Sequence, residues 1–193
     1  MIPRVFKQSL HSYDRALTAH PLVVKMSTSG FLFGLGDFAT QKSTQSSCQK
    51  YDMQRTGRMM IWGGLLFAPI GHLWYNGLEK YITLIGSRGT LLKIAADQLI
   101  FTPPITAFFF YSQQIMTNQN TNQSLLVSWK ALQNQVVETL KVSYMVWPII
   151  HVGTFTYVPL RFQVLYINIM SLGWSSFLSL KANDNNTKEK ELA

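Results

Sequence analysis

The sequence predicts an all-α integral membrane protein, a four-span helical bundle with additional interfacial amphipathic helices. Hydrophobic residues make up 47% of the 193 residues and charged residues only 13%, about half the usual share, which is too few charges to cover a soluble globule. Long apolar tracts also recur along the chain, and a span needs about 20 apolar residues to cross ~30 Å of hydrocarbon. The mean hydropathy of +0.08 is low for a membrane protein, so we expect spans that are short or polar in places.

The first predicted element is an amphipathic helix over residues 3–18. Its apolar residues lie at helical spacing, whereas Arg4, Lys7, His11 and Arg15 occupy much of the other face, with Asp14 the only acid. A basic amphipathic helix of this kind lies well on a membrane surface and is also similar to a mitochondrial import signal. The alternative is a surface helix that packs on a core.

Three predicted spans follow, at about 20–42, 56–80 and 90–114. The first has Lys25 near its start and Asp37 near its end. Residues 59–78 of the second carry no acidic or strongly basic side chain, and the third contains Lys93, Asp97 and the pair Pro103-Pro104. Each tract is long enough to cross the hydrocarbon.

The fourth apolar tract, residues 142–180, would be roughly 58 Å long as one straight helix. Because proline removes a backbone donor and clashes with the preceding turn, we expect breaks at Pro148 and Pro159 and a final span at 160–180; whether the tract crosses once or twice stays open. Before it, residues 117–124 form a polar loop and residues 125–141 an interfacial helix. Residues 1–182 thus form one membrane domain, and residues 183–193 a disordered tail.

Charge and chemistry narrow the function. The net charge of +8 suits anionic lipid headgroups, nucleic acid or an anionic solute as partners. Nucleic acid is not expected because no basic, aromatic-interleaved helix face is present. The single cysteine, Cys48, excludes an intramolecular disulfide, and the four histidines lack metal-ligand spacing. We therefore predict no enzyme activity, no metal and no cofactor.

The stretch S-G-F-L-F-G-L-G-D-F-A-T-Q at 29–41 allows two interpretations. Gly34, Gly36 and Ala39 match a dinucleotide-binding turn, but Asp37 would repel a pyrophosphate, and no alternating βα units follow. Gly30 and Gly34 instead match a small-xxx-small surface, which lets a neighbouring helix approach closely. The second interpretation is preferred. The predicted helix-packing residues are Gly30, Gly34, Gly64 and Ala68.

Ionisable and amide side chains inside the apolar tracts are the candidate functional residues. A charge near the bilayer centre costs a few kcal/mol or more, so it faces an interior or a wet cavity. The predicted pore-lining or interhelical polar residues are Asp37, Gln41, Arg58, His72, Asp97, Gln98, His151 and Arg161. They either line a pathway through the bundle or join helices to one another.

Several long motifs, in order, carry a family resemblance over nearly the whole chain. They are P-L-V-V-K-M-S-T-S-G-F-L-F-G-L-G-D-F-A-T-Q (21–41), D-M-Q-R-T-G-R-M-M-I-W-G-G-L-L-F-A-P-I-G-H-L-W-Y-N-G-L (52–78), K-I-A-A-D-Q-L-I-F-T-P (93–103), W-P (147–148), Y-V-P-L (157–160) and L-G-W-S-S-F-L-S (172–179). The chain resembles the family of the 22 kDa peroxisomal membrane protein and its mitochondrial inner-membrane relatives of the Mpv and Sym type. The resemblance implies four spans, residence in the inner mitochondrial or the peroxisomal membrane, and no enzyme activity. For some members it implies a weakly selective channel for small solutes and a link to mitochondrial nucleotide supply and DNA maintenance.

The chain departs from the family pattern at polar positions. Ala68 stands where the family has glycine, His151 where it has glutamine, and Thr154-Phe155 where it has an Asn-Phe pair. Gln163 stands where the family has an arginine, and this chain has an arginine two residues earlier, at Arg161. A shift of two residues moves the guanidinium about 200° around a helix.

Two functions are expected from these observations. The first is a channel-like pathway for small solutes in the mitochondrial inner membrane, with the peroxisomal membrane as the alternative location. The second is a structural accessory subunit, or a lipid or partner anchor, of a larger respiratory assembly. The expected partners are membrane lipids, together with a second copy of the chain or a larger membrane complex.

Overall fold

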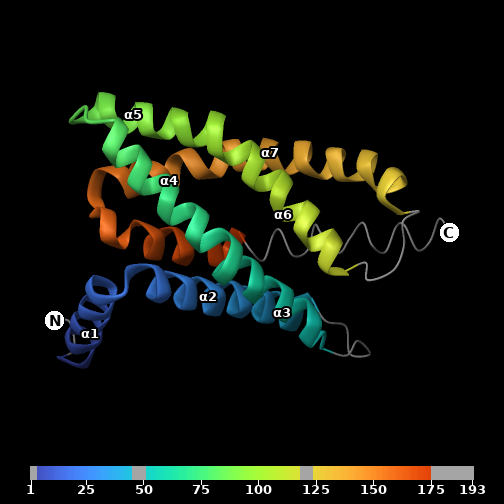
Figure 1. Ribbon diagram of the computed structural model, residues 1–193, viewed down its shortest axis with the longest axis horizontal. Coiled ribbons are helices and arrows are strands. Elements are labelled where there is room, and N and C mark those ends of the chain that lie inside the picture. Colours follow the sequence, from blue (N-terminus) through green and yellow to red (C-terminus); the bar gives the residue numbers. More distant parts are fainter. Residues whose placement is uncertain (1–3, 45–50, 118–123, 175–193) are drawn as a thin grey trace.

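The computed structural model describes residues 4–44, 51–117 and 124–174. Within these ranges every regular element is a helix and none is a strand, which confirms the all-α class (Figure 1). Taken one by one, the helices of these ranges all fall short of the combined length and apolarity needed to cross a membrane.

Two helices form the N-terminal part. Helix α1 spans Arg4–Ala19 and α2 spans Pro21–Thr44, so the predicted amphipathic helix and first tract are both helical. Figure 1 shows α1 folded across the N-terminal end of α2, and Leu17 is buried. Since α2 runs unbroken through residues 29–41, this stretch forms no strand-to-helix turn, and the dinucleotide interpretation is excluded.

The second and third tracts are each a helix with a π-helical segment in the middle. The second comprises α3 (Met53–Ile61), η1 (Trp62–Phe67) and α4 (Ala68–Tyr81). The third comprises α5 (Ser87–Ala96), η2 (Asp97–Phe101) and α6 (Thr102–Thr117). Each runs without a gap, and Gly86, with φ 77°, makes the turn between them.

Both π-helical segments end just before a proline. The N–H of Ala68 donates to the carbonyl of Gly63 and that of Thr102 to Asp97, five residues back in each case. Pro69 and the pair Pro103-Pro104 come directly afterwards. A proline ring in a helix clashes with the carbonyl four residues earlier, so a wider turn at this point relieves the clash and keeps the helix continuous.

The last part corrects two sequence predictions. Helix α7 spans Ser124–Tyr157 with Pro148 inside it, so the predicted interfacial helix 125–141 is not a separate element, and Pro148 does not break the tract. The helix ends before Pro159, as expected, and residues 160–174 form a returning helix. The loss of one backbone hydrogen bond at Pro148 costs a few kcal/mol, which the packing of α7 against α5 and α6 offsets. The predicted tail 183–193 lies outside the described residues.

Glycines line a close helix contact in the bundle. Helices α2 and η1 meet where Gly30 faces Gly64, and a Cβ built on Gly64 would lie 3.3 Å from the Cα of Gly30. A Cβ on Gly34 would lie 2.5 Å from Cγ of Met60. The other predicted packing residue, Ala68, is fully buried. Figure 1 shows α2 and α3 along one side of the bundle, with α5 and α7 on the opposite side.

Candidate functional site

The bundle buries many polar side chains beside its apolar core and exposes many large apolar side chains. Large apolar side chains on the outer faces are exposed, among them Phe31 (62%), Met145 (72%) and Ile149 (75%). The buried polar side chains include Lys25, Ser29, Asp37, Gln41, Asp97, Gln98, Thr139, His151, Thr154, Gln163 and Asn168. Soluble proteins seldom bury so many polar side chains and expose few contiguous apolar surfaces, so this combination is unusual for a protein surrounded by water.

The first buried cluster joins α2 to α3. The carboxylate of Asp37 is fully buried and pairs with Nε of Arg55 at 2.8 Å. It also accepts hydrogen bonds from Thr56 Oγ1 at 2.7 Å and from the Gln41 amide at 2.9 Å. Asp37 and Gln41 are therefore brought together as their spacing predicted, and they brace two helices.

The arginine in this cluster is not the one that the sequence singled out. Arg58 lies 4.0 Å from Asp52, whose side chain also caps α3 by accepting the N–H of Arg55 at 2.9 Å. The buried pair uses Arg55 instead. Sequence spacing within Q-R-T-G-R could not choose between the two arginines, because both lie on a helix whose rotation about its axis only packing fixes.

The second buried cluster centres on Asp97, the first residue of η2. Its Oδ1 accepts the indole N–H of Trp74 at 2.9 Å, and its Oδ2 lies 2.9 Å from Nε2 of His151. The side chains of Gln98 and Thr102 approach Oδ2 at 3.2 and 3.4 Å. Asp97 and His151 are both only 2% exposed. Three tracts, containing α4, η2 and α7, thus converge on one carboxylate.

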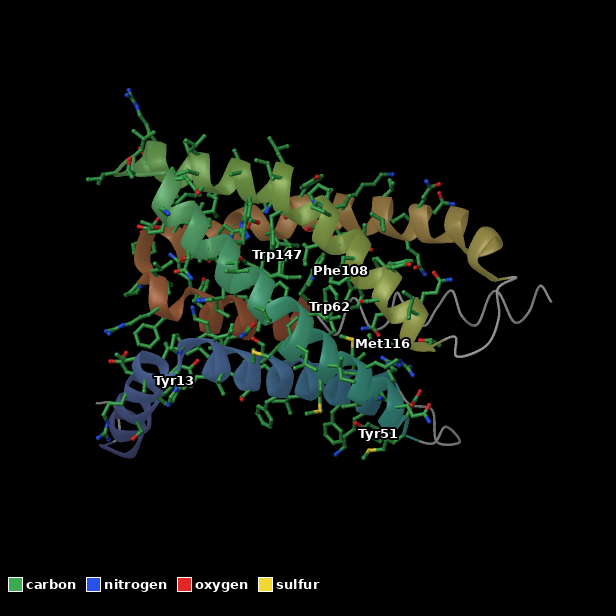
Figure 2. All side chains as sticks on the ribbon, in the orientation of Figure 1. Tyr13, Tyr51, Trp62, Phe108, Met116 and Trp147 are labelled. Atoms are coloured by element: carbon green, nitrogen blue, oxygen red, sulfur yellow. The ribbon has the colours of Figure 1, made fainter. Side chains whose placement is uncertain are left out.

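A cavity of about 70 Å³ adjoins this cluster. Aromatic side chains form most of its wall, and Figure 2 shows two of them, Trp62 and Trp147, near the middle of the bundle. The polar groups that line it are Asp97, Thr102, Thr106, Ser143, His151 and Ser171. A buried water needs ~10–15 Å³ of such volume, so the cavity has room for several waters or one small solute.

The remaining predicted residues lie elsewhere. His72 forms its own contact, with Lys25 Nζ 2.9 Å from its Nδ1 and the amide of Asn76 3.0 Å away. Arg161 is 58% exposed, where it pairs with Asp14 of α1 at 3.2 Å, so it is a surface residue rather than part of the interior. The eight predicted polar residues therefore do not form one continuous lining, and only Asp97 and His151 border the cavity.

Sequence reasoning missed several partners. Nothing in the sequence around Trp74 or around the hydroxyl-bearing residues of the cavity wall indicated that they would lie near Asp97. The hydrogen bond from Asn168 to Ser29, at 2.6 Å, joins the helix at residues 160–174 to α2 across 139 positions. An i, i+4 pattern could not reveal a contact over that separation.

Comparison with known proteins identifies relatives over most of the chain. The sequence model of the Mpv17 / PMP22 family matches residues 121–179. The chain is similar to Protein sym-1 of Neurospora crassa, with 34% identity over 86% of this chain and 95% of that protein. It is also similar to Protein SYM1 of Debaryomyces hansenii (35% identity, 89% of this chain and 87% of that protein) and of Saccharomyces cerevisiae (31% identity, 94% and 93%). No solved structure matches it.

Proposed function

This chain belongs to the Mpv17 / PMP22 family, and from that premise we propose that it is a four-span protein of the mitochondrial inner membrane with a weakly selective pathway for small solutes. The fourth crossing falls in residues 142–180. In this proposal the protein lets solutes pass through it and has no enzymatic activity. The observation that carries this proposal is a cavity bordered by buried polar side chains, in a bundle whose outer faces expose large apolar side chains.

The apolar exterior supports the membrane location. Phe31, Leu35 and Phe38 lie on one outward face of α2, and each is at least 42% exposed. Exposing such side chains to water costs about 25 cal/mol per Å² of apolar area, whereas acyl chains remove that cost. Segments 53–81 and 87–117, each continuous through its π-helical segment, are about 43 and 46 Å long, which exceeds the ~30 Å of hydrocarbon.

The buried polar residues support the pathway. A charged side chain such as that of Asp97 is expensive at bilayer depth, so such residues occur where they contact water, a solute or another charge. Among the aromatic side chains of its wall, the cavity beside Asp97 has four hydroxyl-bearing residues, Thr102, Thr106, Ser143 and Ser171. Hydroxyl groups both donate and accept hydrogen bonds, which suits solutes of mixed chemistry and hence weak selectivity.

The N-terminal helix supports the mitochondrial location. The sequence of α1 contains the basic residues Arg4, Lys7 and Arg15 and a single acid, Asp14. Import signals of mitochondria are amphipathic, basic and poor in acids. Fractionation of cells that express the tagged protein tests this point: recovery with inner mitochondrial membranes supports it, and recovery with peroxisomes overturns it.

Conductance tests the pathway. The purified protein in planar bilayers should give solute-permeable conductance that Asp97→Asn alters and that Ser112→Ala, a buried residue away from the cavity wall, leaves unchanged. Circular dichroism and membrane flotation confirm that each variant is folded and inserted. A folded, inserted wild-type protein that conducts no more than an empty bilayer would rule the pathway out.

A structural role is the second candidate, because buried polar contacts of the interior bridge helices. Asp37 joins α2 to Arg55 of α3, and Asp97 joins η2 to His151 of α7. An accessory subunit or anchor of a larger inner-membrane assembly needs such rigidity and no open passage. Co-migration with a large complex on native gels, combined with absent conductance, favours this candidate over the first.

A further inference from the structure

Three hydroxyl groups on the cavity wall lack a partner. They belong to Thr106, Ser143 and Ser171, which are 9%, 1% and 3% exposed, and none of them hydrogen-bonds another residue in the described part of the chain. Their oxygens are not among the unpartnered atoms that the protein encloses completely. Because the three residues are otherwise buried, these accessible oxygens open onto the cavity. A buried hydroxyl without a hydrogen bond is costly, so all three are available to a molecule inside.

The ionisable groups of the wall offer no such position. Oδ1 of Asp97 accepts the indole N–H of Trp74 at 2.9 Å. The other carboxyl oxygen, Oδ2, is contacted by the side chains of His151, Gln98 and Thr102. The remaining ring nitrogen of His151, Nδ1, is enclosed by the protein. The polar atoms of the Asp97–His151 pair are therefore occupied or closed, whichever of the two residues holds the proton between them.

The rest of the wall favours an uncharged ligand. It is mainly aromatic and carries no further charged side chain, and Trp62 and Trp147 form part of it near the middle of the bundle (Figure 2). An ion in the cavity would lose its hydration without a direct hydrogen bond to an opposite charge, which is expensive. The attraction of aromatic faces for a cation replaces only part of that hydration. An uncharged molecule avoids this cost, and its apolar part packs against the rings.

We propose that this cavity is a binding site for a small uncharged organic molecule that carries one carbonyl or hydroxyl oxygen. The oxygen hydrogen-bonds the hydroxyls of Thr106, Ser143 and Ser171, and the apolar body lies against the aromatic wall. The volume of about 70 Å³ corresponds to about five waters, which limits the ligand to a few heavy atoms. This inference deepens the proposed function, on which it rests for its physiological meaning, because it names the class of solute that the interior holds.

Acetone, acetate and acetamidinium are suitable probes because they share a planar shape and size and differ in charge. The full chain, labelled with ¹⁵N in detergent micelles at neutral pH, reports binding through its indole N–H signals in NMR spectra. Trp62 and Trp147 line the cavity, so acetone should shift both signals saturably. Its Kd should be about 1 mM or weaker, because so few heavy atoms limit the affinity. Acetate and acetamidinium should each bind at least ~10-fold more weakly than acetone.

Variants locate the site. Ser143→Leu places a larger side chain in the cavity from α7 and should abolish acetone binding. Thr106→Val, Ser143→Ala and Ser171→Ala each remove one hydroxyl with little change of shape, and at least one of them should weaken acetone binding roughly 2- to 10-fold, as for a lost hydrogen bond. Ser112→Ala, whose hydroxyl bonds the carbonyl of Phe109 outside the cavity wall, is the matched control and should bind like the wild type.

The outcomes separate this inference from the proposed function. Saturable acetone binding that is lost in Ser143→Leu and weakened by removal of a hydroxyl supports the site, whether or not the protein conducts in bilayers. A wild-type protein that conducts but shows no saturable shift, or that binds acetate or acetamidinium as tightly as acetone, overturns the site and leaves the pathway standing. Unchanged acetone affinity in all three hydroxyl-removing variants also overturns it, and these variants decide the matter if Ser143→Leu fails to fold.

Discussion

The contact between α2 and η1 gives the sharpest stability prediction, because the same substitution at two glycines should have different effects. A Cβ on Gly64 would lie 3.0 Å from the carbonyl oxygen of Met26 and 3.3 Å from the Cα of Gly30. Both are main-chain atoms of α2, so neither can rotate away. A Cβ on Gly77, in α4, would meet nothing within 4 Å.

The magnitude is the sum of two effects. Replacing glycine by alanine within a helix stabilises it by about 1 kcal/mol through backbone entropy, and this gain applies at both positions. Forcing an extra methyl group into a close contact costs about 1–3 kcal/mol, and this cost applies only at Gly64. Gly77→Ala should therefore raise stability by about 1 kcal/mol, and Gly64→Ala should be about 1–3 kcal/mol less stable than Gly77→Ala.

Thermal and denaturant unfolding in one detergent, followed by circular dichroism, measures both variants against the wild type. Size-exclusion chromatography confirms that the compared species share one oligomeric state. If Gly64→Ala proves as stabilising as Gly77→Ala, the two helices are not in backbone contact there and the argument fails.

Single contacts give three further predictions. Asp37→Asn leaves the Arg55 guanidinium beside a neutral amide and should lower the free energy of unfolding by about 3–5 kcal/mol, as for a broken buried pair. Unfolding measurements test this, with Asp37→Glu as the charge-retaining control. A loss below about 1 kcal/mol would contradict a buried pair. Arg161→Gln should cost only about 0–1 kcal/mol because its pair with Asp14 is exposed, and a larger loss in the same assay would show that the exposed pair matters. Pro148→Ala supplies a backbone N–H inside α7 and should raise the melting temperature, whereas a loss of helicity on circular dichroism would show that the proline shapes the helix.

Local patterns predicted the elements better than their partners. The tracts at 20–42, 56–80 and 90–114 became helices with nearly the expected bounds, because helical spacing and apolar length are properties of neighbouring residues. The predicted break at Pro148 was wrong. A proline inside a helix destabilises it by a few kcal/mol, but the packing of α7 against α5 and α6 offsets this loss, and that packing cannot be read from local sequence.

The candidate site was predicted by type rather than by geometry. Asp97 and His151 stood out as polar residues in apolar tracts, but they lie far apart in the chain, and nothing in the spacing joined them to each other or to Trp74. Arg58 was chosen for the role that Arg55 has, and Arg161 proved to be a surface residue. The cavity depends on side chains from most of the bundle, and no local pattern could predict it.

By itself, the sequence determined the helical class, the family, and the set of polar residues that apolar tracts must accommodate, since composition, periodicity and motif order are all read along the chain. The tertiary structure decided which of those residues meet. The physical reason lies partly in η1 and η2, because each π-helical turn adds about one residue and so rotates the rest of the helix by ~100° about its axis. A periodicity of 3.6 therefore loses its phase at both segments, and the side chain that faces Asp97 is fixed only by how the helices pack.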